Sequence, residues 1–144
     1  MSATILYIED NPQNLRLIRR MLSTADYTIL EAFKGETGIQ LALQHRPDLI
    51  LVDINLPDMD GTEVAQRIKA TPGYEQIPII ALTANAMHGD RERFLAKGCD
   101  GYIAKPVSRS ELLEVTAHFL AKRATSGVLP VVDVEPHDPD NPKP

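Results

Sequence analysis

Tryptophan is absent from this chain of 144 residues, and cysteine occurs only once, as Cys99. A lone cysteine cannot form an internal disulfide, so the chain does not belong to the small secreted domains that disulfides hold together. No apolar run has the roughly 20 residues of a membrane-spanning helix. The first apolar run, residues 4–8, has only the length of a strand and is too short for a signal peptide. We therefore expect a cytoplasmic protein that does not associate with a membrane.

Clusters of basic residues are also missing. The chain has 15 Lys and Arg against 20 Asp and Glu, a formal net charge of -5, and its bases are not gathered into a block. A nucleic-acid partner is therefore not expected, because binding to a polyanion depends on basic patches. The 43% hydrophobic content over this length suffices for one folded domain, and the chain is too short for two.

What the sequence does contain is a repeating unit, in which an apolar run is followed by a turn and then by apolar residues at helical spacing. This pattern predicts strands over residues 4–8, 28–32, 48–52, 77–82 and 101–104, and helices over residues 12–24, 35–45, 61–71, 87–97 and 108–122. Asn11-Pro12 is a typical helix start, Gly98 is a typical helix end, and Ser108 with Glu111 forms a capping-box pattern. The predicted fold class is α/β, a doubly wound (βα)5 domain around a five-stranded parallel sheet.

The composition changes after Arg123. Residues 124–144 are rich in proline and acidic residues, namely Pro130, Pro136, Pro139, Pro142, Pro144, Asp133, Glu135, Asp138 and Asp140. We expect a folded domain over residues 1–123 and a disordered tail over residues 124–144. A short partner-binding segment or edge strand at residues 128–134, which contain a brief apolar patch of Val128, Leu129, Val131, Val132 and Val134, is the alternative.

Polar residues follow four of the predicted strands, at the point where each strand ends. They are Glu9 and Asp10, Asp53, Thr83, and Lys105. Because the carboxyl ends of parallel strands meet at one edge of the sheet, where ligands bind, we expect these side chains to converge on one pocket. Three carboxylates, one hydroxyl and one ammonium group would then face each other.

Such a group of acids must be neutralised. Two unit charges about 4 Å apart repel by roughly 4 kcal/mol at an effective dielectric constant near 20, and Lys105 supplies only one compensating charge. Either one carboxyl group stays protonated at neutral pH, or a hard cation such as Mg2+ binds between the oxygens. Acids, a cation site, a hydroxyl and a lysine together indicate a site that holds a phosphoryl group electrostatically.

The motifs that carry these residues resemble the receiver domain of two-component response regulators. The similarity covers residues 3–122 and rests on Glu9-Asp10, Asp53-Ile54-Asn55-Leu56-Pro57-Asp58-Met59-Asp60-Gly61, Leu82-Thr83-Ala84 and Lys105-Pro106. It implies the flavodoxin-like strand order 2-1-3-4-5. It also implies that Asp53 is the phosphoacceptor and that Mg2+ is held by Glu9, Asp10, Asp53 and the backbone carbonyl of Asn55. No other cofactor is implied.

The resemblance also assigns a switch. Thr83 and Lys105 are expected to contact the phosphoryl oxygens only when that group is present, which shifts the domain between two states. Tyr102 is then expected to turn inward and to change the surface formed by the last strand, residues 101–104, and the last two helices, residues 87–97 and 108–122. The alternative for Tyr102 is a static ring with a solvated hydroxyl.

Three further residues are expected to set the geometry of the loops around the site. By resemblance, Pro57 and Gly61 shape the loop after Asp53, and Pro106 follows a cis peptide bond.

The helix predicted over residues 12–24 contains a leucine, Leu17, that is expected to be exposed. Leu15, Ile18 and Leu22 share the face expected to be buried. Leu17 points away from that face, and the residues around it are Gln13, Arg16 and Arg20. We interpret this surface as the docking site of the phosphodonor; an isolated surface leucine is the alternative, since such leucines are common.

The predicted function is that of a single-domain response regulator that takes a phosphoryl group from a histidine kinase or a histidine phosphotransfer protein and then binds a protein target. The segment from Thr83 to Asp90 resembles single-domain regulators of the DivK type and receivers of hybrid histidine kinases. Met1 lies two residues before the first strand, which favours the stand-alone form. A phosphorelay intermediate and a hybrid-kinase receiver stay open.

An enzyme is the more distant alternative. A phosphohydrolase of the haloacid-dehalogenase type also has an aspartyl nucleophile, but it normally has a second Asp where this chain has Asn55. A nucleotide- or flavin-binding protein would need a Gly-rich loop after the first strand, and none is present. We expect no catalysis beyond the protein's own phosphorylation and dephosphorylation.

The histidines and the cysteine are not expected to form a site. His45, His88, His118 and His137 lack metal-ligand spacing, and of these His118 could lie in the core. Cys99 is expected to pack at the base of the last strand.

Overall fold

The computed structural model describes residues 2–84 and 90–128. Its strands are β1 (Ala3–Ile8), β2 (Tyr27–Ala32), β3 (Leu49–Asp53), β4 (Ile79–Thr83) and β5 (Gly101–Ala104). Its helices are α1 (Pro12–Leu22), α2 (Gly35–His45), α3 (Gly61–Lys69), α4 (Asp90–Ala96) and α5 (Arg109–Val128). The strands form one parallel sheet in the order β2-β1-β3-β4-β5, so the predicted fold class and strand order are confirmed.

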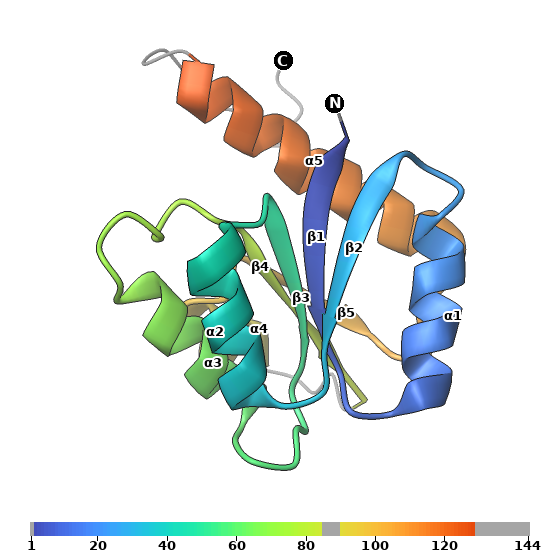
Figure 1. The fold of residues 1–144 in the computed structure, drawn as a ribbon, viewed down its shortest axis with the longest axis horizontal. Coiled ribbons are helices and arrows are strands. Elements are labelled where there is room, and N and C mark those ends of the chain that lie inside the picture. Colours follow the sequence, from blue (N-terminus) through green and yellow to red (C-terminus); the bar gives the residue numbers. More distant parts are fainter. Residues whose placement is uncertain (1, 85–89, 129–144) are drawn as a thin grey trace.

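Helices cover both faces of this sheet, with α2, α3 and α4 on one face and α1 and α5 on the other (Figure 1). Residues along β1 alternate between the two cores. Leu6 and Ile8 join the core under α2, α3 and α4, whereas Ile5 and Tyr7 join the core under α1 and α5. The central strands β3 and β4 are buried at every position, which explains why they are apolar until their last residue.

The predicted helix ends are formed by local hydrogen bonds. The side chain of Asn11 accepts hydrogen bonds from the backbone N–H groups of Gln13 and Asn14, at 2.8 and 3.1 Å. The hydroxyl of Ser108 accepts a hydrogen bond from the backbone N–H of Glu111. These contacts satisfy N–H groups that have no partner within their own helix. Helix α1 begins at Pro12 as predicted, and α5 begins at Arg109, one residue after the predicted start.

Several predicted boundaries were wrong by a few residues. Helix α1 ends at Leu22 and α3 at Lys69, two residues earlier than expected in each case. After both helices a threonine hydroxyl bonds back to a carbonyl of the last turn, Thr24 to Met21 and Thr71 to Arg67, and such bonds compete with helix continuation.

The last helix was also predicted too short. Helix α5 continues to Val128 instead of ending at residue 122, because no proline interrupts the chain before Pro130. The expected start of the tail at residue 124 therefore falls within this helix. Residues 129–144 lie outside the described residues, as does the predicted start of α4 at residue 87.

A lysine ties α3 to the amino ends of β4 and β5. The Nζ of Lys69 donates to the backbone carbonyls of Glu75 and Ile77, at 3.1 and 2.8 Å, and forms an ion pair with Asp100 at 2.8 Å. The same Asp100 oxygen accepts the backbone N–H of Ile79, the first residue of β4. One connected set of polar contacts thus holds the amino ends of β4 and β5, at the edge of the sheet opposite the carboxyl ends of the strands.

Within the described ranges, no helix has the length and apolar character that crossing a membrane requires.

Candidate functional site

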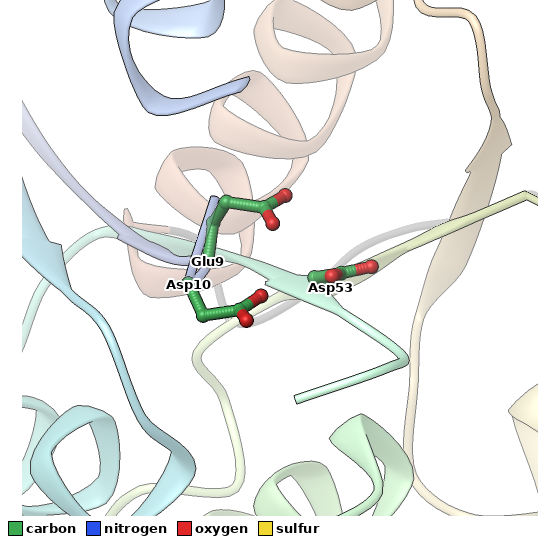
Figure 2. A group of neighbouring side chains, drawn as sticks. All are labelled: Glu9, Asp10 and Asp53. Carbon is green, nitrogen blue, oxygen red and sulfur yellow. The ribbon is translucent and has the colours of Figure 1, made fainter. Parts of the chain in front are cut away.

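The acids predicted at the strand ends come together at the carboxyl edge of the sheet. Glu9 and Asp10 directly follow β1, and Asp53 is the last residue of β3 (Figure 2). One carboxylate oxygen from each lies within 4.8 Å of the other two. Glu9 and Asp53 are almost fully buried, at 1% and 4% exposure, whereas Asp10 is exposed. The cluster therefore has a closed inner side and an open outer side.

Lys105 reaches this cluster from the segment after β5. Its Nζ lies 3.1 Å from Asp53 Oδ1 and 3.4 Å from Glu9 Oε1, so one ammonium group contacts two carboxylates. Its backbone N–H donates to the carbonyl of Thr83 at 2.8 Å, and its peptide bond to Pro106 is cis, as the resemblance implied. One positive charge stands against three carboxyl groups, which leaves the cluster with excess negative charge.

Glu9 is held by three hydrogen-bond donors. Its Oε1 accepts the hydroxyl of Tyr7 at 2.9 Å as well as the ammonium of Lys105, and its Oε2 accepts the backbone N–H of Asn11 at 3.2 Å. Burial and the neighbouring Glu9 carboxylate raise the pKa of the Tyr7 phenol, which therefore remains a donor. A buried carboxylate needs such partners, and Glu9 has them on both oxygens.

The electrostatics of Asp53 reflect its surroundings. Burial raises the pKa of the Asp53 carboxyl group, and the charge of Glu9 raises it further. Lys105 and the backbone N–H of Asn55 act in the opposite direction, but the pKa stays above its ordinary value. The negative form of Asp53 is therefore costly in the protein alone, and a cation beside it would lower that cost.

The loop between β3 and α3 is fixed from within. Asn55 and Asp60 form an isolated antiparallel bridge, and the backbone N–H of Gly61 donates to the carbonyl of Ile54 at 2.8 Å. A Cβ atom on Gly61 would collide with the backbone carbonyl oxygen of Asp53 and would lie 2.9 Å from the Cα of Ile54. Only glycine permits this close approach, so Gly61 sets the position of the backbone that carries Asp53.

The same loop is also tied to helix α2. The carboxylate of Asp58 accepts the backbone N–H groups of Gly35 and Glu36, at 2.8 and 3.0 Å. These hydrogen bonds lower the pKa of Asp58. Asp58 thus performs the capping role that the residue before α2, Lys34, does not perform. Pro57, the other loop residue expected to set this geometry, is exposed beside it.

Thr83 and Tyr102 lie on β4, which is next to the strand of Asp53, and on β5, which is next to β4. Thr83 ends β4, is 4% exposed, and pairs with Ala104 of β5. Tyr102 is half-buried on β5, with its ring 5.6 Å from that of Phe94 on α4 and tilted by 55°. Thr83 thus stands at the edge that carries the acids, and the ring of Tyr102 packs against α4. The switching roles assigned to both residues stay predictions.

The outer face of α1 agrees with the predicted arrangement. Leu15, Ile18 and Leu22 are buried, whereas Leu17 is 47% exposed. The neighbouring residues Gln13, Arg16 and Arg20 are exposed as well.

A cavity of about 340 Å³ lies between this helix and the segment after β5. Its lining includes Leu17 and Asn14 from α1, Tyr7 from β1, and Lys105 and Val107. An apolar hollow thus directly adjoins the acidic cluster.

The remaining candidates take no part in the cluster. His45 and His118 are exposed, so His118 is not in the core, and His88 and His137 lie outside the described residues. Cys99 is 3% exposed beside β5, as predicted, and burial raises the pKa of its thiol to about 11.

Two contacts at this edge were missed by the sequence analysis. Tyr7 lies two residues before Glu9, so the period of two along a strand could have placed both on one face. Asp58 contacts a helix start 23 positions earlier in the chain, and no local pattern signals such a contact.

The donor set fits a magnesium ion. Mg2+ prefers oxygen ligands and is usually held by one or two carboxylates together with phosphate oxygens and water. The oxygens of Glu9, Asp10 and Asp53 lie close enough to share one ion, and the cluster has excess negative charge. The exposed position of Asp10 leaves room for water and for a phosphoryl group on the outer side.

Comparison with known proteins gives a consistent result. A family model described as the response regulator receiver domain matches residues 5–117. The polar-differentiation response regulator DivK of Brucella anthropi is 39% identical over 120 residues, which are 83% of this chain and 98% of that protein.

Solved structures are similar as well. The receiver domain of a sensor histidine kinase from Pseudomonas aeruginosa, with a magnesium ion coordinated in its active site cleft, is 38% identical with a TM-score of 0.78, over 84% of this chain and 99% of that one. A putative response regulator from Chloroflexus aurantiacus is 27% identical with a TM-score of 0.80, over the same shares of the two chains.

Proposed function

This chain belongs to the response regulator receiver family of two-component phosphorelay signalling, and we propose that its Asp53 accepts a phosphoryl group from the phosphohistidine of a kinase or phosphotransfer protein. The observation that carries the proposal is the convergence of Glu9, Asp10 and Asp53 with Lys105 at one edge of the sheet. Receiver domains act as signalling modules that interact with histidine kinases and downstream targets. The family membership agrees with the resemblance seen in the sequence.

The proposed reaction is a single phosphoryl transfer. An oxygen of Asp53 attacks the phosphorus atom, the bond from phosphorus to the donor's histidine nitrogen breaks, and its electron pair returns to the imidazole. Lys105 neutralises part of the charge on the phosphoryl oxygens. Glu9, Asp10, Asp53 and the backbone carbonyl of Asn55 would hold Mg2+, which when bound would offset the negative charge shared by the acids and the phosphoryl group.

The proposed output is a change in partner binding. Once Asp53 carries the phosphoryl group, contacts from Thr83 and Lys105 to its oxygens favour one of two states. Tyr102, which packs against Phe94, then changes the surface of α4, β5 and α5, where a downstream protein binds. We propose that this domain acts by itself in the cytoplasm, as a single-domain regulator. Passage of the phosphoryl group to another histidine is the second form of the same function.

The proposed donor surface is the outer face of α1. Exposed Leu17 and the adjoining apolar cavity offer apolar contact area next to Lys105, which contacts Asp53. Arg16 and Arg20 add positive charge. A donor that docks here would bring its phosphohistidine to the open side of the acidic cluster.

Mass spectrometry after incubation with acetyl phosphate tests the central proposal. We expect one phosphoryl group on Asp53 in the presence of Mg2+, and none after chelation or in Asp53→Ala. Asp10→Ala should also abolish labelling, whereas Asp26→Ala, which removes an exposed acid before β2, should not. Labelling at another residue, or labelling of Asp53 that persists without a divalent cation, would contradict the proposal.

A further inference from the structure

The phenol of Tyr7 is an unusual group to find directly beneath a cluster of acids. Tyr7 is fully buried in β1, and its ring packs with the residues under α1 and α5. Its hydroxyl donates a hydrogen bond to Glu9 Oε1 at 2.9 Å, so the polar end of the side chain contacts the acidic cluster. A buried hydroxyl without a partner is costly, so this contact fixes both side chains.

The geometry separates the donors of Glu9 into strong and weak ones. Hydrogen bonds from nitrogen to oxygen usually span about 2.7–3.2 Å. The ammonium of Lys105 lies 3.4 Å from Glu9 Oε1 but 3.1 Å from Asp53 Oδ1, so it is placed better for Asp53. The hydroxyl of Tyr7 is therefore the closer donor to the oxygen of Glu9 that both groups contact.

This arrangement has a consequence when Lys105 moves. If Lys105 turns toward a phosphoryl group on Asp53, Glu9 Oε1 loses its ammonium contact, and the oxygen is too buried for water to replace it freely. The Tyr7 hydroxyl, which is rigidly held by its strand, can still donate to that oxygen. Glu9 then keeps its position without drawing Lys105 back.

From these contacts we infer that Tyr7 is a positioning residue, which holds the Glu9 carboxylate in place for a divalent cation and leaves Lys105 available to Asp53. The inference rests on the proposed function, because it assumes that Glu9 helps to hold Mg2+. Partners of metal-binding carboxylates act in this way, and their loss typically lowers metal affinity by about 10–100-fold.

The test is the Mg2+ affinity of Tyr7→Phe, measured by isothermal titration calorimetry and by NMR titration of the unphosphorylated protein. Phenylalanine keeps the ring, which lines the cavity between α1 and the segment after β5, so the packing is preserved. We expect the dissociation constant for Mg2+ to rise about tenfold, at the lower end of that range, because Tyr7 contacts only one of the three carboxylates. Tyr27→Phe is the matched control, since Tyr27 packs against the same core from β2 and should leave the affinity unchanged.

A second variant separates positioning from a general effect on structure. If Tyr7 acts through Glu9, then Tyr7→Phe should have no further effect on Mg2+ affinity in a Glu9→Ala background. An equal loss in both backgrounds, or a change of less than about threefold in the wild-type background, would overturn the inference while leaving the proposed function intact. Absence of Mg2+ binding by the wild-type protein would overturn both.

Discussion

Replacement of Gly61 by alanine tests whether the backbone beneath the phosphoacceptor is as closely packed as the structure indicates. Carbon atoms that are not bonded usually lie about 3.5 Å apart or more. An added Cβ would lie 2.9 Å from the Cα of Ile54, about 0.6 Å too close, and would also collide with the carbonyl oxygen of Asp53. Both obstacles are backbone atoms, so no side chain can turn aside to make room.

The energetic cost follows from two opposing effects. Overpacking of this kind costs about 1–3 kcal/mol. Alanine restricts the unfolded chain more than glycine does, which offsets about 0.4–1 kcal/mol of that cost. We therefore expect Gly61→Ala to lower the free energy of unfolding by about 1–2 kcal/mol, measured by urea denaturation. Since the Asp53 backbone must shift, we also expect phosphorylation by acetyl phosphate to slow by about tenfold or more.

The control for this experiment is Gly73→Ala. Gly73 has a φ of +92°, so alanine there costs about 1–2 kcal/mol of backbone strain. An added Cβ at Gly73 would, however, make an ordinary van der Waals contact with Arg46, whose Nη1 would lie 3.8 Å away. Gly73 also lies 20 positions after Asp53 in the chain. We expect similar destabilisation but an unchanged rate of phosphorylation. Close packing of Gly61 beneath Asp53 would be refuted if Gly61→Ala matched the wild type in both measurements, or if the control slowed phosphorylation equally.

Four further predictions follow from the charges and surfaces of the site. The folded-state pKa of Asp53 is raised, so its contribution to stability is present in acid and lost as the pH rises through that pKa. Without divalent cations, Asp53→Asn should therefore have a higher melting temperature than the wild type at neutral pH and a smaller difference in acid. A difference in melting temperature that does not change with pH would contradict this prediction. The folded-state pKa of Asp58 is lowered from 3.8, so its contribution to stability is present above that value and lost as the pH falls through the lowered pKa. Asp58→Ala should therefore be less stable than the wild type at neutral pH, and the melting temperatures of the two proteins should converge in acid. At a Mg2+ concentration 100 times the dissociation constant, the wild type should gain about 2.7 kcal/mol of stability, a gain that calorimetry should not detect in Asp10→Ala. Leu17→Glu should slow phosphoryl transfer from a phosphohistidine donor by about fivefold or more, as expected for the loss of about 1 kcal/mol of docking free energy. Equal slowing of phosphorylation by acetyl phosphate would instead indicate misfolding.

The acidic cluster could be predicted because it depends only on where strands end. Glu9, Asp10 and Asp53 each follow a recognisable apolar run, and parallel strands place their carboxyl ends together whatever the details of packing. Lys105 lies beside them for the same reason, because it directly follows β5. Strand identity and direction thus determine the composition of the site before any side-chain geometry is known.

Contacts that depend on side-chain geometry could not be predicted in the same way. The hydrogen bond from Tyr7 to Glu9 forms only if the phenol side chain is long enough to reach a carboxylate two residues further along the chain. The capping of α2 by Asp58 requires two segments that are distant in the sequence to meet. Helix ends also depend on competition between weak contacts. Helix α1 ends two residues early, where the hydroxyl of Thr24 bonds to a carbonyl of the last turn, and α5 continues to Val128.

The lysine contacts on the far side of the sheet bear on how a signal could spread through this domain. Lys69 and Asp100 clasp β4 and β5 where these strands begin, whereas Thr83 and Ala104 lie at the opposite tips. Because these polar contacts restrain both strands at their first residues, we expect the backbone to move least there and more toward the carboxyl ends. A rearrangement that starts at the carboxyl ends would then be weak at α3, which Lys69 ties to the restrained ends, and would act more strongly on α4, whose Phe94 contacts Tyr102 of β5.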